Sequence, residues 1–415
     1  MKKCITLAAS LLLLMTFNSC IKDTCSHVSS YTWFEPVYKT TAEVRANIKS
    51  GAPRDIKAPG KLFLIGNYIF LNEINKGIHI INNSNPAAPV NTAFIEIPGN
   101  IDVAVKGNTL YADLYTDLVT LDISNPLQVV TTSIVDHVFP HRYYGFTPDS
   151  TKVIYDWIRH DTTFTADCNN NQWGRPEALF MNTSDVAAFK SIAGGSPTGI
   201  AGSMARFALM NNYLYTVGQS QLKTLSIADP QKPVVANTVQ LPWGIETIYP
   251  FKDRLFIGSN TGMYIFNTAN PAAPVQLGTF SHARVCDPVI ADDRHAFVTL
   301  RNGTTCQGFL NELNIVDITN LTQPVLVKKY DLTNPHGLSK DGDLLLICDG
   351  RDGLKIFDAK NVNQLILKKQ LRIGNTYDVI AWNGLALVVT SDALVQLDYT
   401  NINQVKVLSK LSIAQ

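Results

Sequence analysis

Eight polar or charged residues recur along this 415-residue chain, mostly about 40 residues apart, and they are its first candidates for chemistry. They are Lys61, Asp102, Arg142, Arg206, Glu246, Asp287, His336 and Asp378. Three further basic residues lie close to members of this set: His141, His282 and Arg284. Such groups could bind a polar ligand or an ion, and a histidine with carboxylates could act as general acid and base.

A second candidate is the long segment of residues 158–177, which carries Trp173 and Arg175 among asparagines. A long loop inside a compact repeat is usually functional or disordered. An exposed Trp beside Arg would suit stacking on a sugar ring or gripping a protein. The alternative is a Trp that folds back and covers the domain.

A repeated turn organises the elements that must position these residues. An Asn or Asp, often followed by Pro, ends an apolar run at Asn85, Asn125, Asp229, Asn270, Asn320, Asn361 and Asn401. Most of these positions are 40 or 41 residues apart, which indicates a repeat architecture. The interval from Asn125 to Asp229 is much longer, and we expect a degenerate copy there, with strands in residues 143–157 and 178–192. The prediction is therefore eight modules.

Each module contains short apolar or alternating runs separated by Gly, Asn and Asp, which predict strands joined by tight turns. In the second module the four runs are residues 101–105, 109–114, 118–123 and 129–134. Four short antiparallel strands, repeated around an axis, form a β-propeller blade. We therefore predict an all-β fold, a β-propeller with eight four-stranded blades over residues 56–415; the alternative is seven blades.

A propeller would bring the candidate residues together. The connections that enter the inner strands and the loops between the second and third strands share one face, and function tends to reside on such loops. The eight recurring residues are expected at the inner-strand entrances, and residues 158–177 join that face if they form a loop between second and third strands. The alternative is that converging inner strands place polar residues near the axis in any case, with opposite charges paired.

The modules also resemble a known family. Residues 67–90, 109–126 and 343–361 are similar to LVIVD repeats, which are named for a Leu-Val-Ile-Val-Asp core and occur in bacterial cell-surface propeller proteins. The resemblance extends over about residues 56–413 and implies a propeller. It implies little about function, because the repeat's motif residues are strand and turn positions.

The N-terminus has the features of a secretory signal peptide. Lys2 and Lys3 precede the apolar residues 5–17, a stretch too short to span a bilayer. Cys20 follows a small residue and resembles the lipidated cysteine of Bacteroidota-type lipoproteins. The resemblance implies removal of residues 1–19, a lipid on Cys20 and an anchor in the bacterial cell envelope, at the outer membrane. The alternative is an ordinary cleaved signal with an unmodified cysteine.

Residues 20–55 are expected to be a lipidated N-terminus and tether. Residues 40–51 could form a short helix with Thr40 or Thr41 as its cap and Gly51 as its stop. Composition points away from nucleic acid, because the net charge is only +1 and basic residues do not cluster. No motif in the sequence calls for a cofactor or a metal ion.

Five cysteines remain once Cys4 and Cys20 are set aside, so at least one is unpaired within the chain. Cys286 and Cys306 are predicted on the same face of the sixth module and are the favoured disulfide. Cys348 lies in an apolar strand and is expected to be a buried thiol.

Two function classes follow from these features. The first is a lipid-anchored module that binds or scaffolds a protein or glycan partner, and we expect no catalysis there. The second is a propeller hydrolase or lyase acting on a polysaccharide. Close carboxylates or a histidine with a strongly shifted pKa would favour the enzyme, whereas paired charges with an exposed aromatic patch would favour binding.

Overall fold

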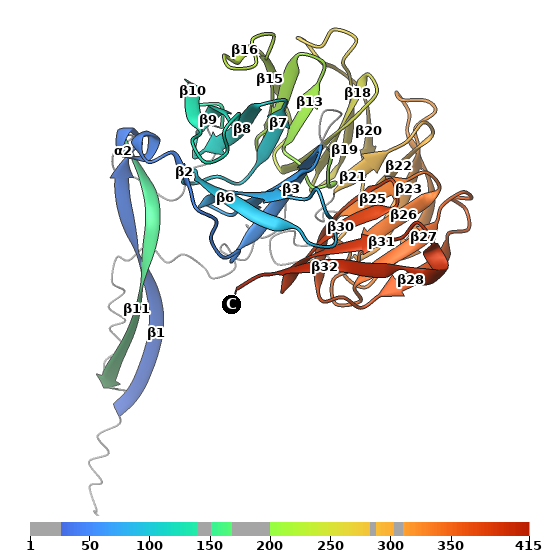
Figure 1. The fold of residues 1–415 in the computed structure, drawn as a ribbon. Helices are drawn as coiled ribbons and strands as arrows, with labels where there is room; N and C mark the ends of the chain where they lie inside the picture. The colour runs from blue at the N-terminus through green and yellow to red at the C-terminus, as the bar shows by residue number, and fades with distance from the viewer. Residues whose placement is uncertain (1–25, 140–150, 168–199, 283–287, 303–309, 415) are drawn as a thin grey trace, which may run out of the picture. The chain divides into compact units, whose positions relative to one another are not determined.

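The computed structural model describes residues 26–139, 151–167, 200–282, 288–302 and 310–414 (Figure 1). The chain divides into two compact units. One comprises Met1–Val37 and Asp156–Met181, and the other comprises Tyr38–Tyr155 and Asn182–Gln415. The second unit holds all the blades.

The second unit is an all-β propeller of seven four-stranded blades. Each blade is an antiparallel sheet built from consecutive strands, the first innermost and the fourth outermost. Blades one and two are β3 (Pro59–Ile65), β4 (Tyr68–Glu73), β5 (Gly77–Asn82) and β6 (Val90–Glu96), then β7 (Val103–Lys106), β8 (Thr109–Leu114), β9 (Asp117–Asp122) and β10 (Val130–Val135). Blades three and four are β13 (Phe207–Met210), β14 (Tyr213–Val217), β15 (Gln221–Ser226) and β16 (Val234–Gln240), then β17 (Ile245–Phe251), β18 (Arg254–Ser259), β19 (Gly262–Asn267) and β20 (Val275–Ser281).

The remaining blades follow the same order (Figure 1). Blade five is β21 (Val289–Ala291), β22 (His295–Leu300), β23 (Glu312–Asp317) and β24 (Val325–Asp331). Blade six is β25 (Leu338–Asp341), β26 (Leu344–Cys348), β27 (Leu354–Asp358) and β28 (Ile366–Leu371). Blade seven is β29 (Thr376–Trp382), β30 (Leu385–Thr390), β31 (Ala393–Asp398) and β32 (Lys406–Ser412), with the 3-10 turn η1 (Ile402–Gln404) before its last strand.

The predicted count of eight blades is wrong, and the alternative of seven is confirmed. Inner strand β7 of blade two contacts inner strand β13 of blade three directly, so no blade lies between them. Blade seven closes the ring against blade one, where the Gln396 amide donates to Asn83 Oδ1 (2.6 Å) and Ser409 Oγ donates to the Pro86 carbonyl (2.7 Å).

The expected third module is replaced by a different element. β11 (Lys152–Asp167) belongs to no blade and pairs with β1 (Ser26–Thr40) in a two-stranded sheet. Midway along this sheet the Trp33 indole stacks on His160, with ring centroids 4.4 Å apart, and its N–H donates to Thr162 Oγ1 (3.0 Å). The prediction of a loop between second and third blade strands is therefore wrong for the part of residues 158–177 that lies in β11. Residues 168–177 and the other expected late strand, 178–192, lie outside the described residues.

The repeated Asn or Asp holds the turn before the outer strand in every blade. In Asn85 the side-chain oxygen accepts from the Ala87 N–H (3.1 Å), and its backbone carbonyl accepts from the Ala88 N–H (2.9 Å). The same pair of hydrogen bonds recurs at Asn125, Asp229, Asn270, Asn320, Asn361 and Asn401. The motif is an Asx turn, so its sequence period marks blades and not function.

The segment before the first blade is ordered and adds to it. α2 (Thr41–Ala46) begins with Thr40 in a capping box with Glu43, as the sequence predicts for Thr40. The helix ends at Ala46, with Asn47 as its C-cap, and does not reach Gly51, because β2 (Lys49–Gly51) pairs with outer strand β6. The propeller thus recruits residues N-terminal to position 56.

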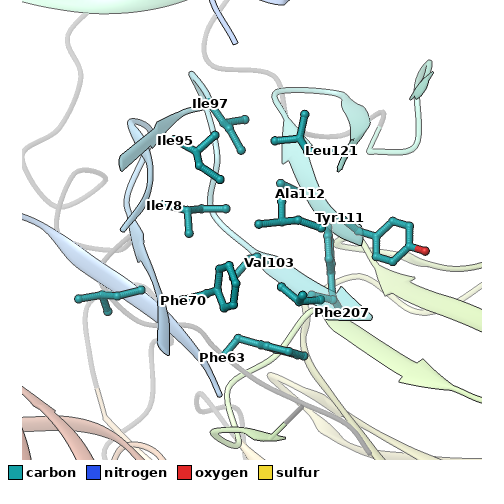
Figure 2. Packing of buried hydrophobic residues seen from close by; sticks show 14 of the residues in the cluster. Phe63, Phe70, Ile78, Ile95, Ile97, Val103, Tyr111, Ala112, Leu121 and Phe207 are labelled. Carbon is teal, nitrogen blue, oxygen red and sulfur yellow. The ribbon is translucent and has the colours of Figure 1, made fainter. Parts of the chain in front are cut away.

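Apolar side chains fill the space between neighbouring blades. Figure 2 shows Phe70 and Ile78 of blade one facing Val103 and Ala112 of blade two. These side chains are at most 3% exposed, so each blade depends on its neighbour to cover its face.

Candidate functional site

Two predicted residues, one from each of the first two blades, form a buried ion pair near the axis. Lys61 Nζ on β3 lies 3.2 Å from Asp102 Oδ2, and both side chains are 1% exposed. Asp102 also accepts the Arg206 backbone N–H (2.7 Å) and that of Val103 (2.8 Å). The carboxylate is therefore fully engaged in holding blades one, two and three together.

A connecting segment crosses between blades at this position. β12 (Ile200–Ala201) pairs with inner strand β3, and Gly202 to Met204 follow. Ser203 Oγ accepts from the Leu338 N–H of blade six (2.8 Å), and the Met204 carbonyl accepts from Lys61 Nζ of blade one (3.2 Å). Gly202 to Met204 are buried, so this segment joins blades that are not neighbours in the chain.

Asp378 is the third predicted residue in this cluster. It lies on β29, is 4% exposed, and neither carboxylate oxygen makes a hydrogen bond of normal geometry with the described residues. Gly202 and Gly337 pack so closely that a Cβ on either would overlap the carboxylate. Burial raises the pKa of Asp378 to about 7, although Lys61 and the Val379 N–H favour the ionised form.

His336 lies at the entrance to blade six and is also enclosed. It is 6% exposed; its Nε2 pairs with Asn334 Oδ1 (2.9 Å), while Nδ1 has no partner among the described residues. Burial and the nearby Arg301 guanidinium lower the pKa of His336 to about 3, so the imidazole is neutral at physiological pH.

Towards blades three, four and five the predicted residues become more accessible. Arg206 and Glu246 are half-buried, and Arg206 Nε donates to the Glu246 carbonyl (3.4 Å). Arg301, which the sequence analysis did not select, is half-buried and interacts electrostatically with Glu246. The axis therefore carries buried charges on one side and partly exposed ones on the other.

The same accessible side exposes an aromatic residue that the sequence analysis missed. Trp243 is 60% exposed and lies in the connection from β16 to β17, just before Glu246. Next to it, the Gly244 N–H donates to the Gln219 carbonyl in the β14–β15 turn (2.8 Å). The sequence gives one indication of this site: Trp243 precedes a Gly in a connection that enters an inner strand.

Several predicted residues lie outside the described residues and keep the status of predictions. They are Cys20, His141, Arg142, Trp173, Arg175, Arg284, Asp287, and the proposed disulfide partners Cys286 and Cys306. His282 is described and half-buried beside Phe280. Cys348 is a buried free thiol, as expected.

The described residues offer no obvious metal site or membrane-spanning helix. Among them, no group of three or more His, Cys, Asp or Glu side chains is placed to hold a metal ion. No helix in this part of the chain is both long and apolar enough to cross a bilayer.

Comparison with known proteins agrees with this architecture. Residues 60–93, 100–136 and 308–332 match the model described as LVIVD repeat, on blades one, two and five. The chain contains LVIVD repeats. No curated protein matches it in sequence.

Solved structures share the fold at low sequence identity. A crystal structure of a protein from Lactobacillus plantarum is 12% identical, with a TM-score of 0.51 and coverage of 86% of this chain and 97% of that chain. The periplasmic gluconolactonase PpgL of Pseudomonas aeruginosa is 12% identical, with a TM-score of 0.50 and coverage of 85% and 96%. At such identities the likeness shows the propeller fold alone.

Proposed function

We propose that this protein is a lipoprotein of the bacterial cell envelope, anchored at the outer membrane through Cys20, whose propeller binds a protein or glycan partner. The signal-like residues 1–19 and the position of Cys20 support the anchor. The LVIVD repeats and the rigid ring support a scaffold that presents loops to a partner.

The observation that carries the binding function is Trp243. A Trp that is 60% exposed leaves a large aromatic surface available for contact with a partner. Its ring can stack on a sugar or fill a protein pocket, and Arg206 and Glu246 nearby can supply polar contacts. Binding surfaces combine an aromatic anchor and a polar rim in this way.

An enzyme is the second candidate, because Asp378 and His336 have strongly shifted pKa values. Both groups, however, are at most 6% exposed, and glycine backbone packs against the Asp378 carboxylate. Burial is the main cause of both pKa shifts, and the Arg301 guanidinium adds to that of His336. The geometry therefore favours a role for these residues in holding the ring together, and a binding function for the protein.

The experiment compares four forms of the full chain in a bacterial envelope: wild type, Cys20→Ala, Trp243→Ala and Trp382→Ala. Trp382 is the matched control, because it is 46% exposed but is the last residue of β29, at the opposite ends of the blade strands. Incorporation of labelled palmitate is measured first. Retention of envelope polysaccharides and of envelope proteins by the purified forms is measured next.

Wild type should incorporate palmitate and Cys20→Ala should not; an unlabelled wild type would contradict the anchor. Trp243→Ala should weaken the retained interaction by roughly 30-fold, the equivalent of about 2 kcal/mol for an aromatic anchor. Trp382→Ala should leave it unchanged. Equal binding by the Trp243 and Trp382 variants would remove the support for this face.

A further inference from the structure

The outer strands of the seven blades differ in charge although their turns are alike. In blades two, three and four, β10, β16 and β20 contain no Asp, Glu, Lys or Arg. In blades five, six and seven, β24, β28 and β32 each contain two lysines. We define the basic belt as Lys328, Lys329, Lys368, Lys369, Lys406 and Lys410.

The belt is continuous across three neighbouring blades. Tyr330 of β24 donates its hydroxyl to the Val362 carbonyl (2.7 Å) and accepts the Leu365 N–H (3.0 Å), so blade five holds the turn that leads into β28. η1, which leads into β32, contacts β28 in turn. The three outer strands that carry the lysines therefore follow one another on the outer wall.

Three of the six lysines have no counter-ion among the described residues. Lys329 pairs with Glu312 (2.7 Å) and Lys368 with Asp358 (3.3 Å), and Lys406 lies opposite Asp398 on the neighbouring strand, where its charge lowers the pKa of that carboxyl. Lys328, Lys369 and Lys410 make no ion pair with any described residue. Asp331 on β24, with Glu312, Asp358 and Asp398 on the strands beside the belt, sets four negative charges against the six lysines and leaves a formal charge of +2.

Exposed apolar side chains lie beside the lysines, as they also do on the outer strands of the other blades, so the combination with lysine is what distinguishes blades five to seven. Val325 is 62% exposed, Ile366 is 50% and Val407 is 50%, and Leu367 is 47% exposed beside Lys368. Lysines with interleaved apolar groups suit the boundary of a bilayer, where the ammonium groups meet anionic headgroups and the apolar groups leave water. A purely hydrophilic polyanion would leave these apolar groups hydrated.

Edge protection is the competing explanation, since lysines on an outer strand prevent pairing with another sheet. That role would apply equally to β10, β16 and β20, which carry no charge at all. The restriction of the lysines to three adjacent blades therefore needs a local cause. We infer that the basic belt is a docking surface for an anionic lipid bilayer, a binding site separate from the Trp243 face and independent of the lipid on Cys20.

The test uses the full chain with Cys20→Ala, so that no lipid is attached at that position. Vesicles of phosphatidylcholine alone are compared with vesicles that also contain phosphatidylglycerol, and bound protein is measured by co-sedimentation at low and high salt. The ratio of the affinity for anionic vesicles to that for neutral vesicles measures the contribution of the belt. Any apolar contact of the N-terminal residues with lipid contributes to binding of both vesicle types and cancels in this ratio. The belt variant carries Lys328→Glu, Lys369→Glu and Lys410→Glu, one from each blade.

The matched control carries Lys57→Glu, Lys232→Glu and Lys252→Glu, which change the net charge equally at exposed positions outside the belt. Three lysines at a membrane surface correspond to roughly a 100-fold change in affinity. We expect the belt variant to lose its preference for anionic vesicles by about that factor, the control to keep most of it, and high salt to weaken it in all forms.

Replacement of the same three lysines by arginine should keep the preference for anionic vesicles. That result would mean that the belt requires positive charge and not a contact specific to lysine. Far-UV circular dichroism and urea unfolding confirm that each variant is folded. Glutamate also protects a strand edge, so the belt variant should stay soluble whichever explanation holds. If that soluble variant binds anionic vesicles as well as wild type does, edge protection explains the lysines and the proposal is overturned. Equal losses in the belt and control variants, or binding to an acidic polysaccharide but not to anionic vesicles, would also overturn it.

Discussion

Two lysine–carboxylate pairs with the same separation show how differently the axis and the outer wall of this propeller use charge. Lys61 Nζ and Asp102 Oδ2 near the axis are 3.2 Å apart, as are Lys49 Nζ and Glu96 Oε2 at the outer edge of blade one. The axial side chains are each 1% exposed, whereas those at the edge are 65% and 39% exposed. Distance alone therefore does not determine what an ion pair contributes.

Solvent explains the difference. Water screens the outer pair and solvates either partner alone, so the pair contributes little to stability. At the axis, each charge depends on its partner and on backbone groups, because water does not replace them. Charge on the outer wall remains available to a binding partner, while the buried charge of Lys61 and Asp102 is committed to the fold.

The largest effect should come from breaking the axial pair. Lys61→Ala leaves the Asp102 carboxylate buried without its counter-ion, and we expect the free energy of unfolding to fall by about 3–5 kcal/mol. Lys49→Ala, the control at the same distance, should change it by less than about 1 kcal/mol. Urea unfolding of both variants measures this contrast, and equal losses would show that burial does not separate the two regions.

The next largest effect is the contribution of Asp378 to the pH dependence of the free energy of unfolding. Its pKa is about 7 in the fold but about 3.9 in an unfolded chain, so the raised folded value favours the native state below about pH 4. This contribution is lost as the pH rises through about 7, by about 4 kcal/mol in all. Asp378→Asn removes the titrating group, so wild type should lose stability relative to this variant between pH 4 and pH 7.

The titration of His336 is the reason for comparing wild type with the Asp378→Asn variant. Its pKa of about 3 is below the unfolded value of about 6.5, so its contribution is present above pH 6.5 and is lost as the pH falls towards 3. The two slopes oppose each other, and wild type alone can show a flat profile. A constant difference between wild type and Asp378→Asn across this range would contradict the raised pKa.

Much of the fold was predictable from the sequence because the blades repeat one local structure. The Asx turn and the strand that precedes it are local, so Asn85 and its equivalents give the strands, the turns and the propeller class. The error came from treating the gap between Asn125 and Asp229 as a lapsed copy. That gap contains β11, whose partner β1 lies more than a hundred residues earlier, and no local pattern predicts such a pairing.

The candidate site was predictable only in part. Lys61, Asp102 and Asp378 were predicted near the axis because each lies where the chain enters an inner strand. The structure brings these three residues together there. Their burial was not predictable, because it depends on Gly202 to Met204, a segment that crosses from the far side of the insertion. Trp243 was missed for the related reason that exposure depends on what the neighbouring blades leave uncovered.

The smallest of the three effects tests that crossing segment. Gly202→Ala places a Cβ against the Asp378 carboxylate, and we expect a loss of about 2 kcal/mol in the free energy of unfolding. Gly218→Ala, in the turn between β14 and β15, meets no atom within 4 Å and should stay within about 0.5 kcal/mol of wild type.

A double-mutant cycle then assigns the cause of that loss. If the overlap with the carboxylate is responsible, Gly202→Ala should cost much less when Asp378 is already Ala, because the atoms that it would meet are gone. An unchanged cost in the Asp378→Ala background would instead mean that the segment needs Gly202 for its backbone path. The axis would then be held by the course of the chain through it, and the packing of Gly202 against Asp378 would be a consequence of that course.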